Sequence, residues 1–197
     1  MRKINNVIIY VVTFLSLLIA VKDFNIGKYD RLLGDLTIFF VFMLPRIVNK
    51  LFKFNLENKV EFIYIIFIFI SQFLGSVLNL FNIIWWYDLF THFISGILTS
   101  ILALLLLQYF NVYDKNKKFN LFFLLIFTIF IAALWEFMEF FADTFLNMNV
   151  QHSVDTGVID TMEDMLIATL GGLIVFIKYL FEKNKNSMLS KFVKTRN

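Results

Sequence analysis

Long apolar runs set the strongest limit on what this chain can fold into. A helix rises 1.5 Å per residue, so about 20 apolar residues cross the roughly 30 Å hydrocarbon core of a bilayer. Because lipid offers no water to backbone N–H and C=O groups, each such run must form a helix. We therefore predict an all-α, polytopic membrane helix bundle of about six transmembrane helices, near residues 4–21, 32–49, 60–82, 89–110, 119–145 and 161–181.

The composition agrees with a membrane protein and excludes several kinds of site. The chain is 59% hydrophobic and has one Pro and 7 Gly in 197 residues. It has no Cys, which excludes disulfides, thiolate metal ligands and a Cys nucleophile. The segments that join the apolar runs are short, which favours a compact antiparallel bundle. We expect one integral membrane domain over residues 1–197.

The first apolar run resembles a signal peptide but lacks a cleavage pattern. Arg2 and Lys3 precede the apolar residues 7–21. The end of the run has no small-x-small motif before Lys22. We therefore expect an uncleaved first helix.

The basic residues predict the direction in which the helices cross the membrane. Loops on the cytoplasmic side carry an excess of Lys and Arg. With the N-terminus inside, only Lys22, Lys28 and Arg31 of the 18 Lys and Arg residues fall outside, and the other 15 fall inside. Both termini are therefore expected in the cytoplasm, with the aromatic run 85–87 at the outer interface. Since the basic residues lie in short clusters between apolar runs, the net charge of +3 indicates topology and no nucleic-acid partner.

Acidic residues gather in the last three predicted helices and at their outer ends. No Lys or Arg occurs between Phe119 and Ile177, so these acids have no basic partner close in sequence. A charged carboxylate at membrane depth costs about 3 kcal/mol or more. It must be protonated, bound to a cation, hydrated or paired with a distant base. Eight acids and both histidines are involved: Asp88, Glu136, Glu139, Asp143, Asp155, Asp160, Glu163, Asp164, His92 and His152.

The spacing of these residues places each set on one helical face. Residues three, four or seven apart share a face of an α-helix. The predicted orientation puts three such sets at the same outer depth. The sets are Asp88 with His92, Glu136 with Glu139 and Asp143, and Asp160 with Asp164.

Small residues continue the same three faces toward the cytoplasm. Small side chains let membrane helices approach closely. We therefore expect the acidic faces to be contact faces of a three-helix core. The residues are Ser95, Gly96, Thr99 and Ala103, then Thr128 and Ala132, then Ala168, Gly171 and Gly172.

Structural roles compete with a functional one at several of these positions. Asp88 fits an N-cap, and Asp160 with Glu163 fits a capping box. Asp143, His152 and Asp155 fit solvated loop or helix-end residues. Glu136 and Glu139 resist such an interpretation, because the macrodipole disfavours negative charge toward a helix C-terminus. Gln72, Ser76 and Asn79 form a polar stripe in the third run, where we expect interhelical hydrogen bonds.

Carboxylates and imidazoles at these spacings on facing helices are typical of metal sites in helix bundles. We predict a site for a divalent ion, Mg, Mn, Zn or Fe. The predicted ligands are Asp88, His92, Glu136, Glu139, Asp160 and Asp164, with Asp143, Asp155 and His152 as further candidates.

The motifs in the C-terminal half resemble the YjdF type, a family of bacterial inner-membrane proteins without an established activity. The matching stretches are Tyr87-Asp88-x-x-x-His92-Phe93-x-x-Gly96, Glu136-x-x-Glu139, Asp160-Thr161-x-x-Asp164-Met165 and Gly171-Gly172. The family pattern also has a His- and Tyr-containing segment late in the third span, where this chain reads Gly75-Ser76-Val77-Leu78-Asn79-Leu80. A fainter likeness to VanZ-like membrane proteins rests on an Asp and a His at a helix start. The YjdF resemblance implies the bacterial cytoplasmic (inner) membrane.

Three functional hypotheses follow from the acidic site, in a protein whose first partner is the lipid bilayer. The first is metal-assisted hydrolysis or transfer on a lipid or envelope substrate at the outer leaflet. The second is a transporter or channel for protons or metal ions, since intramembrane carboxylates serve that purpose. The third is a non-catalytic membrane subunit whose acids bind a partner.

Overall fold

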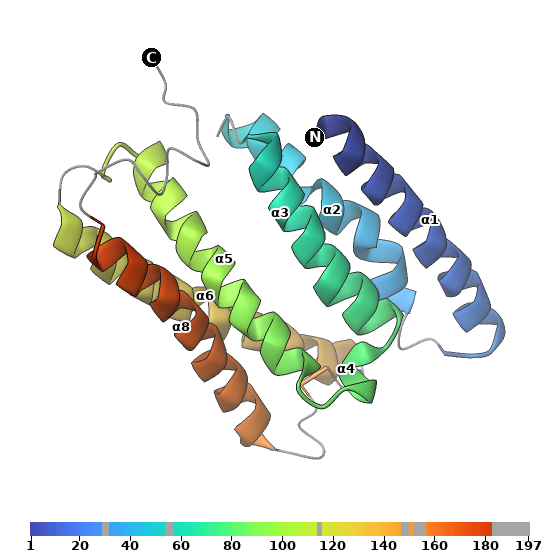
Figure 1. Ribbon diagram of the computed structural model, residues 1–197. Helices are drawn as coiled ribbons and strands as arrows, with labels where there is room; N and C mark the ends of the chain where they lie inside the picture. The colour runs from blue at the N-terminus through green and yellow to red at the C-terminus, as the bar shows by residue number, and fades with distance from the viewer. Residues whose placement is uncertain (29–31, 54–56, 114–115, 147–149, 152–156, 183–197) are drawn as a thin grey trace. The chain divides into compact units, whose positions relative to one another are not determined.

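The computed structural model is helical and describes residues 1–28, 32–53, 57–113, 116–146, 150–151 and 157–182. Its contacts group the chain into two compact units, one covering Met1–Tyr87 and one that begins at Asp88. Long helices form where the apolar runs predicted them (Figure 1). Their bounds are α1 Arg2–Asn25, α2 Leu32–Phe52, α3 Asn58–Ile68 continued by the π-helix η2 Phe69–Val77, α4 Leu80–Ile83, α5 Tyr87–Tyr109, α6 Lys117–Leu146 and α8 Val158–Leu180.

The first unit packs α1, α2, α3 and η2 around an apolar core. Apolar residues three or four apart on each helix point inward, as an amphipathic helix requires. Side-chain hydrogen bonds join the helices between these layers. Ser16 donates to the Asp35 carbonyl at 3.1 Å, and Tyr64 donates to the Val41 carbonyl at 2.9 Å. The core residues are Ile9, Val12, Ile38, Phe42, Ile65, Ile68, Phe73 and Val77.

The third helix ends earlier than the sequence predicted. The prediction that the helix near residues 60–82 is continuous was wrong at its C-terminal end. The π-helix η2 ends at Val77, and Asn79 adopts a left-handed conformation with φ 66°. Asn readily adopts this conformation, and the short α4 follows it. The predicted interhelical hydrogen bonding is confirmed at Gln72, whose amide donates to the Gly34 carbonyl at 3.2 Å.

The second unit brings α5, α6 and α8 together through small residues. A Cβ added to Gly96 on α5 would overlap the Ala168 carbonyl on α8, and one added to Gly171 would overlap the Phe93 carbonyl. Ser100 and Thr128 make a buried hydroxyl–hydroxyl hydrogen bond of 2.6 Å between α5 and α6. The predicted close contact of the small-residue faces is therefore confirmed.

The distribution of polar and apolar side chains is that of a membrane protein. Large apolar side chains point outward, and Phe14, Phe40, Phe122 and Leu166 are each more than 60% exposed. Polar side chains lie inside, as lipid requires. Within the described chain, four helices are long and apolar enough to cross a membrane: α1, α3 with η2, α5 and α6. Helices α2 and α8 have comparable lengths of 21 and 23 residues.

Candidate metal-binding site

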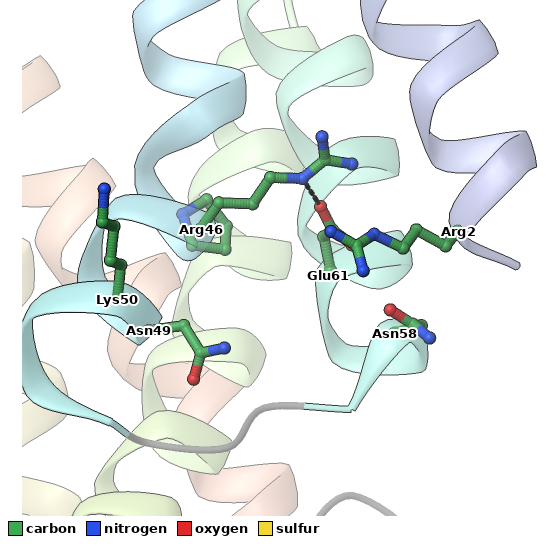
Figure 2. A pocket seen from close by; sticks show the side chains of 7 residues that line it. Arg2, Arg46, Asn49, Lys50, Asn58 and Glu61 are labelled. Carbon is green, nitrogen blue, oxygen red and sulfur yellow. Dashed lines mark hydrogen bonds and ion pairs between the residues drawn. The ribbon is translucent and has the colours of Figure 1, made fainter.

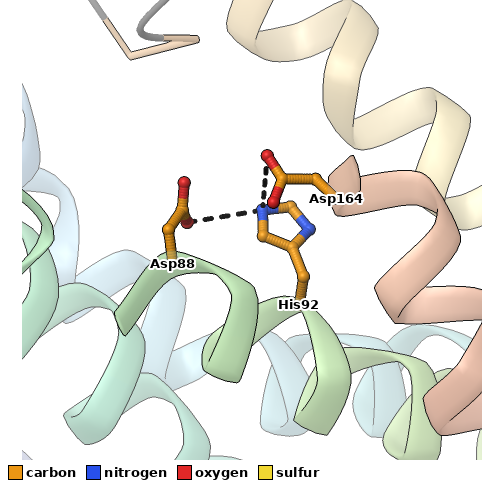
Figure 3. Close-up of side chains that lie close together, drawn as sticks. All are labelled: Asp88, His92 and Asp164. Carbon is orange, nitrogen blue, oxygen red and sulfur yellow. Dashed lines mark ion pairs between the residues drawn. The ribbon is translucent and has the colours of Figure 1, made fainter. Parts of the chain in front are cut away.

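Two acids and a histidine from α5 and α8 converge in the second unit (Figure 3). The His92 Nε2 atom lies 3.5 Å from an Asp88 carboxylate oxygen and 3.8 Å from an Asp164 carboxylate oxygen. One ligand-type atom from each of the three residues lies within 4.8 Å of the others. His92 and Asp164 are buried, whereas the Asp88 side chain is 22% exposed.

The helix crossing described above explains why these three side chains meet. Asp88 and His92 lie one turn apart on α5, so they share a face. Gly96 follows His92 by one turn, and Ala168 follows Asp164 by one turn. The contact between Gly96 and Ala168 therefore fixes the two helices directly beside the acids. Without a glycine at this point, the backbones could not bring His92 and Asp164 so close.

The distances in this group are longer than those of short charge-assisted hydrogen bonds. A charge-assisted hydrogen bond between N and O measures about 2.7–2.9 Å, well below the 3.5 Å and 3.8 Å found here. Two ligands about 2.0–2.2 Å from a tetrahedral ion lie about 3.3–3.6 Å apart. The Asp88–His92 separation of 3.5 Å lies in this range, and the Asp164–His92 separation of 3.8 Å lies above it.

Glu136 on α6 adds a buried carboxylate to the same region. It is 3% exposed, and neither of its carboxylate oxygens has a hydrogen-bond partner of normal geometry among the described residues. The Thr161 hydroxyl interacts with Glu136 but does not reach that geometry. Glu136 interacts electrostatically with His92, Asp88 and Asp160. An unpaired buried charge of this kind is costly, so Glu136 needs a proton or a cation.

Two further predicted ligands, Glu139 and Asp143, have hydrogen-bond partners of their own. Glu139 accepts a hydrogen bond of 2.7 Å from the Trp135 indole, while it also feels the charges of Glu136 and His92. Asp143 accepts hydrogen bonds from the backbone N–H groups of Val150 and Gln151 at 2.6 Å and 3.0 Å. The structural interpretation of Asp143 as a helix-end residue is therefore the better one.

Asp160 lies in the first turn of α8, one turn before Asp164, and interacts electrostatically with Asp164 and Glu136. The predicted capping box at Asp160 is wrong, since α8 begins at Val158 and its N-cap is Gly157. Asp88 is likewise inside α5 rather than at its N-cap, because that helix begins at Tyr87. His152 and Asp155 lie outside the described residues.

A second polar cluster in the first unit was not predicted as a site. Arg46 on α2 forms an ion pair with the buried Glu61 on α3, and Asn5 on α1 donates to the other Glu61 oxygen at 2.9 Å. Arg46 also donates to the Asn6 side chain at 2.7 Å. From the sequence, Arg46 counted only as one of the 15 basic residues expected on the cytoplasmic side. A signal was present, since Pro45 and Arg46 interrupt an otherwise apolar run.

Comparison with known protein families gives one result of wide coverage. The family described as "Predicted membrane protein (DUF2238)" matches residues 4–185. The chain belongs to this family. The match includes all the described helices except the first residues of α1, so the DUF2238 assignment applies to both units. No curated protein and no solved structure matches the chain.

Proposed function

We propose that this DUF2238 protein binds a divalent cation through Asp88, His92 and Asp164, with Glu136 as a fourth ligand. The observation that carries the proposal is the convergence of three ligand-type atoms within 4.8 Å of one another. The buried Glu136 carboxylate, which has no hydrogen-bond partner of normal geometry among the described residues, also supports it. A divalent cation would balance several negative charges in a unit whose residues 119–177 include no Lys or Arg.

The donor set narrows the choice of ion. It offers carboxylate oxygens and one imidazole nitrogen, and the chain has no Cys. Imidazole favours Zn and Fe, whereas carboxylates and water favour Mg and Mn. The mixed set therefore fits Zn, Fe or Mn better than Ca, which prefers six to eight oxygen ligands.

The reaction class we propose is hydrolysis or transfer on a lipid or envelope substrate. A bound metal lowers the pKa of its water to about 7, and a spare carboxylate can accept the proton as that water attacks. The position of the group supports this class. Asp88 is close to the start of α5, and Asp164 is close to the start of α8. Under the predicted inside location of both termini, these helix ends face the outer leaflet of the inner membrane.

A transporter is the alternative from another functional class. It would need polar groups that continue along the helices toward the opposite face. One turn or more beyond the acids lies the buried Ser100–Thr128 pair, and beyond that the interior is apolar at Leu104 and Leu124, which are both 0% exposed. This apolar layer favours a one-sided site.

Metal analysis of the purified protein tests the proposal most directly. Elemental analysis of the detergent-purified wild type should find about one divalent ion per chain. A chelator should then lower its thermal stability, because an ion at 100 times its Kd contributes about 2.7 kcal/mol. Glu136→Gln should keep the fold but lose most of the chelator response. Gln retains the size of the side chain but supplies no charge to the ion.

Glu163→Gln is the matched control. Glu163 is exposed and adjacent to Asp164 on the same helix, so its replacement removes one negative charge without touching the three converging residues. This variant should respond to chelator like the wild type. A wild type without bound metal, whose stability is indifferent to chelators and added ions, would refute the metal site and favour carboxylates that carry protons.

A further inference from the structure

A basic pocket lies at one end of the first unit, separate from the residues of the proposed metal site. Its volume is about 370 Å³, within the range of about 300–1,000 Å³ that is usual for small-ligand sites. It forms where α1 begins, α2 ends and α3 begins (Figure 2). Its lining residues are Arg2, Pro45, Arg46, Asn49, Lys50, Asn58 and Glu61.

The charges of the lining are unequal. Three cationic side chains, those of Arg2, Arg46 and Lys50, line the pocket together with a single carboxylate, that of Glu61. Glu61 is already engaged by Arg46 and by the Asn5 amide. Among the described residues, Arg2 and Lys50 make no ion pair with a carboxylate. The pocket therefore presents two uncompensated positive charges to a ligand.

The backbone reinforces this preference for negative charge. Helices α1 and α3 both begin at the pocket, at Arg2 and Asn58, and neither has a side-chain hydrogen bond at its N-cap. Free N–H groups and the positive end of the macrodipole favour an anion at such helix starts. The Asn58 amide adds a neutral donor. Guanidinium, ammonium and N–H groups together are the usual donors to a phosphate.

The place of the pocket indicates where such an anion would come from. It sits at the ends of apolar helices, two of which are long enough to cross a membrane, so it lies at the level where phospholipid headgroups begin. We propose that this pocket binds a phosphate-bearing anion, either the headgroup of an anionic phospholipid or a free phosphate. Arg2 and Lys50 supply the binding charge, while Arg46 is held in position by Glu61.

A pair of double variants separates a defined pocket from general surface charge. Arg2→Gln/Lys50→Gln removes the two uncompensated lining charges and leaves the Arg46–Glu61 pair intact. Lys3→Gln/Lys59→Gln removes two exposed charges next to Arg2 and Asn58 that do not line the pocket. Each protein is purified in zwitterionic detergent and titrated with short-chain phosphatidylglycerol, short-chain phosphatidylcholine and inorganic phosphate. Calorimetry gives the Kd, and the melting temperature reports folding.

The wild type should bind phosphatidylglycerol and be stabilised by it, with no comparable response to phosphatidylcholine. Loss of Arg2 and Lys50 should weaken this binding by about 10- to 30-fold, whereas the control variant should change it less than about 3-fold. Binding of phosphatidylglycerol without inorganic phosphate assigns the ligand to a lipid headgroup, and binding of both assigns it to phosphate. Equal losses in the two double variants, or no binding of either anion to the wild type, would overturn the proposal. Chelators leave this binding unaffected, which separates it from the metal site.

Discussion

Two buried carboxylates of this protein, those of Glu61 and Glu136, differ in whether the chain supplies a basic partner. Glu61, 7% exposed, lies against Arg46 and the Asn5 amide inside the first unit. Glu136, 3% exposed, has no base in its stretch of sequence and no regular hydrogen bond among the described residues. The first acid is neutralised by the chain itself. The second needs a proton or a cation, which is why we propose an ion at Glu136, whereas Glu61 belongs to a structural pair.

The two units also hold their helices together differently. In the first unit, polar side chains reach across to backbone carbonyls, as from Ser16 to Asp35 and from Gln72 to Gly34. In the second, Gly96 and Gly171 let backbones touch. A side chain can shift by some tenths of an ångström, but backbone-to-backbone contact cannot adjust in this way. The second unit should therefore tolerate less change, which is a requirement of a site that fixes ligand geometry.

The largest effect expected is an all-or-none difference in labelling from outside the cell. The region of the acidic group near Asp88 should be labelled, and the region of the basic pocket should not. The chain has no Cys, so single substitutions can be labelled without background. Trp85→Cys, at a side chain that is 85% exposed just before Asp88, should react with an impermeant maleimide in intact cells. Lys59→Cys, at the pocket end of α3, should react only after the cells are permeabilised. The reverse pattern would place the acidic group on the cytoplasmic side and exclude an outer-leaflet substrate.

The next largest effect is expected at the internal ion pair. Arg46→Gln should destabilise the protein by about 3 kcal/mol, the low end of the usual cost of leaving one member of a buried pair alone, because the Arg46 side chain is 27% exposed. The double variant Arg46→Gln/Glu61→Gln should recover much of this loss, because both charges are then absent. Unfolding in mixed micelles with increasing denaturing detergent gives the free energies. If the single variant costs less than about 1 kcal/mol, the pair is a surface interaction, and the comparison with Glu136 fails.

A smaller effect tests the difference in helix packing. Gly96→Ala should destabilise by about 1–3 kcal/mol, as overpacking usually does, because the new methyl group meets the Ala168 backbone. It should also weaken metal binding, since His92 and Asp164 would move apart. Gly34→Ala is the matched control in the first unit, where the methyl group meets only the Ser76 hydroxyl at 2.9 Å. The control should change stability by less than 1 kcal/mol and leave metal content unchanged; equal effects would contradict the packing argument.

Much of the fold could be predicted from the sequence, because the length and hydropathy of an apolar run identify a membrane helix. The ends of α5 and α6 agree with the expected ranges 89–110 and 119–145 to within two residues. The break at Asn79 was not predicted, because an Asn within an apolar run can equally well donate a hydrogen bond to another helix. Its left-handed conformation depends on the turn into α4, which no periodicity reveals.

The candidate site was predictable only in part, for a geometric reason. Spacing showed that Asp88 with His92, and Asp160 with Asp164, share faces. Which members of a face meet depends on where the helices cross, and that is fixed by the Gly96–Ala168 contact. Ion pairs between side chains on different helices could not be predicted from the sequence. Arg46 and Glu61 are 15 residues apart on different helices, and nothing in either segment alone identifies the other as its partner.

The smallest effect expected is the one that separates the two carboxylates most cleanly, because its sign differs between them. In metal-free protein, Glu136→Gln should be neutral or stabilising by up to about 1 kcal/mol, since a buried carboxyl without a cation takes up a proton to become neutral and Gln has the same shape. Glu61→Gln should instead cost about 1.5–3 kcal/mol, the range for a hydrogen bond to a charged group, because Arg46 and Asn5 both lose an ionised partner. Both free energies of unfolding are measured in excess chelator.

Adding the divalent ion found by elemental analysis should then stabilise the wild type and Glu61→Gln equally, whereas Glu136→Gln should gain little stability. A loss of stability in metal-free Glu136→Gln as large as that in Glu61→Gln would mean that Glu136 also has an internal partner, and the case for an external ion at this position would no longer hold.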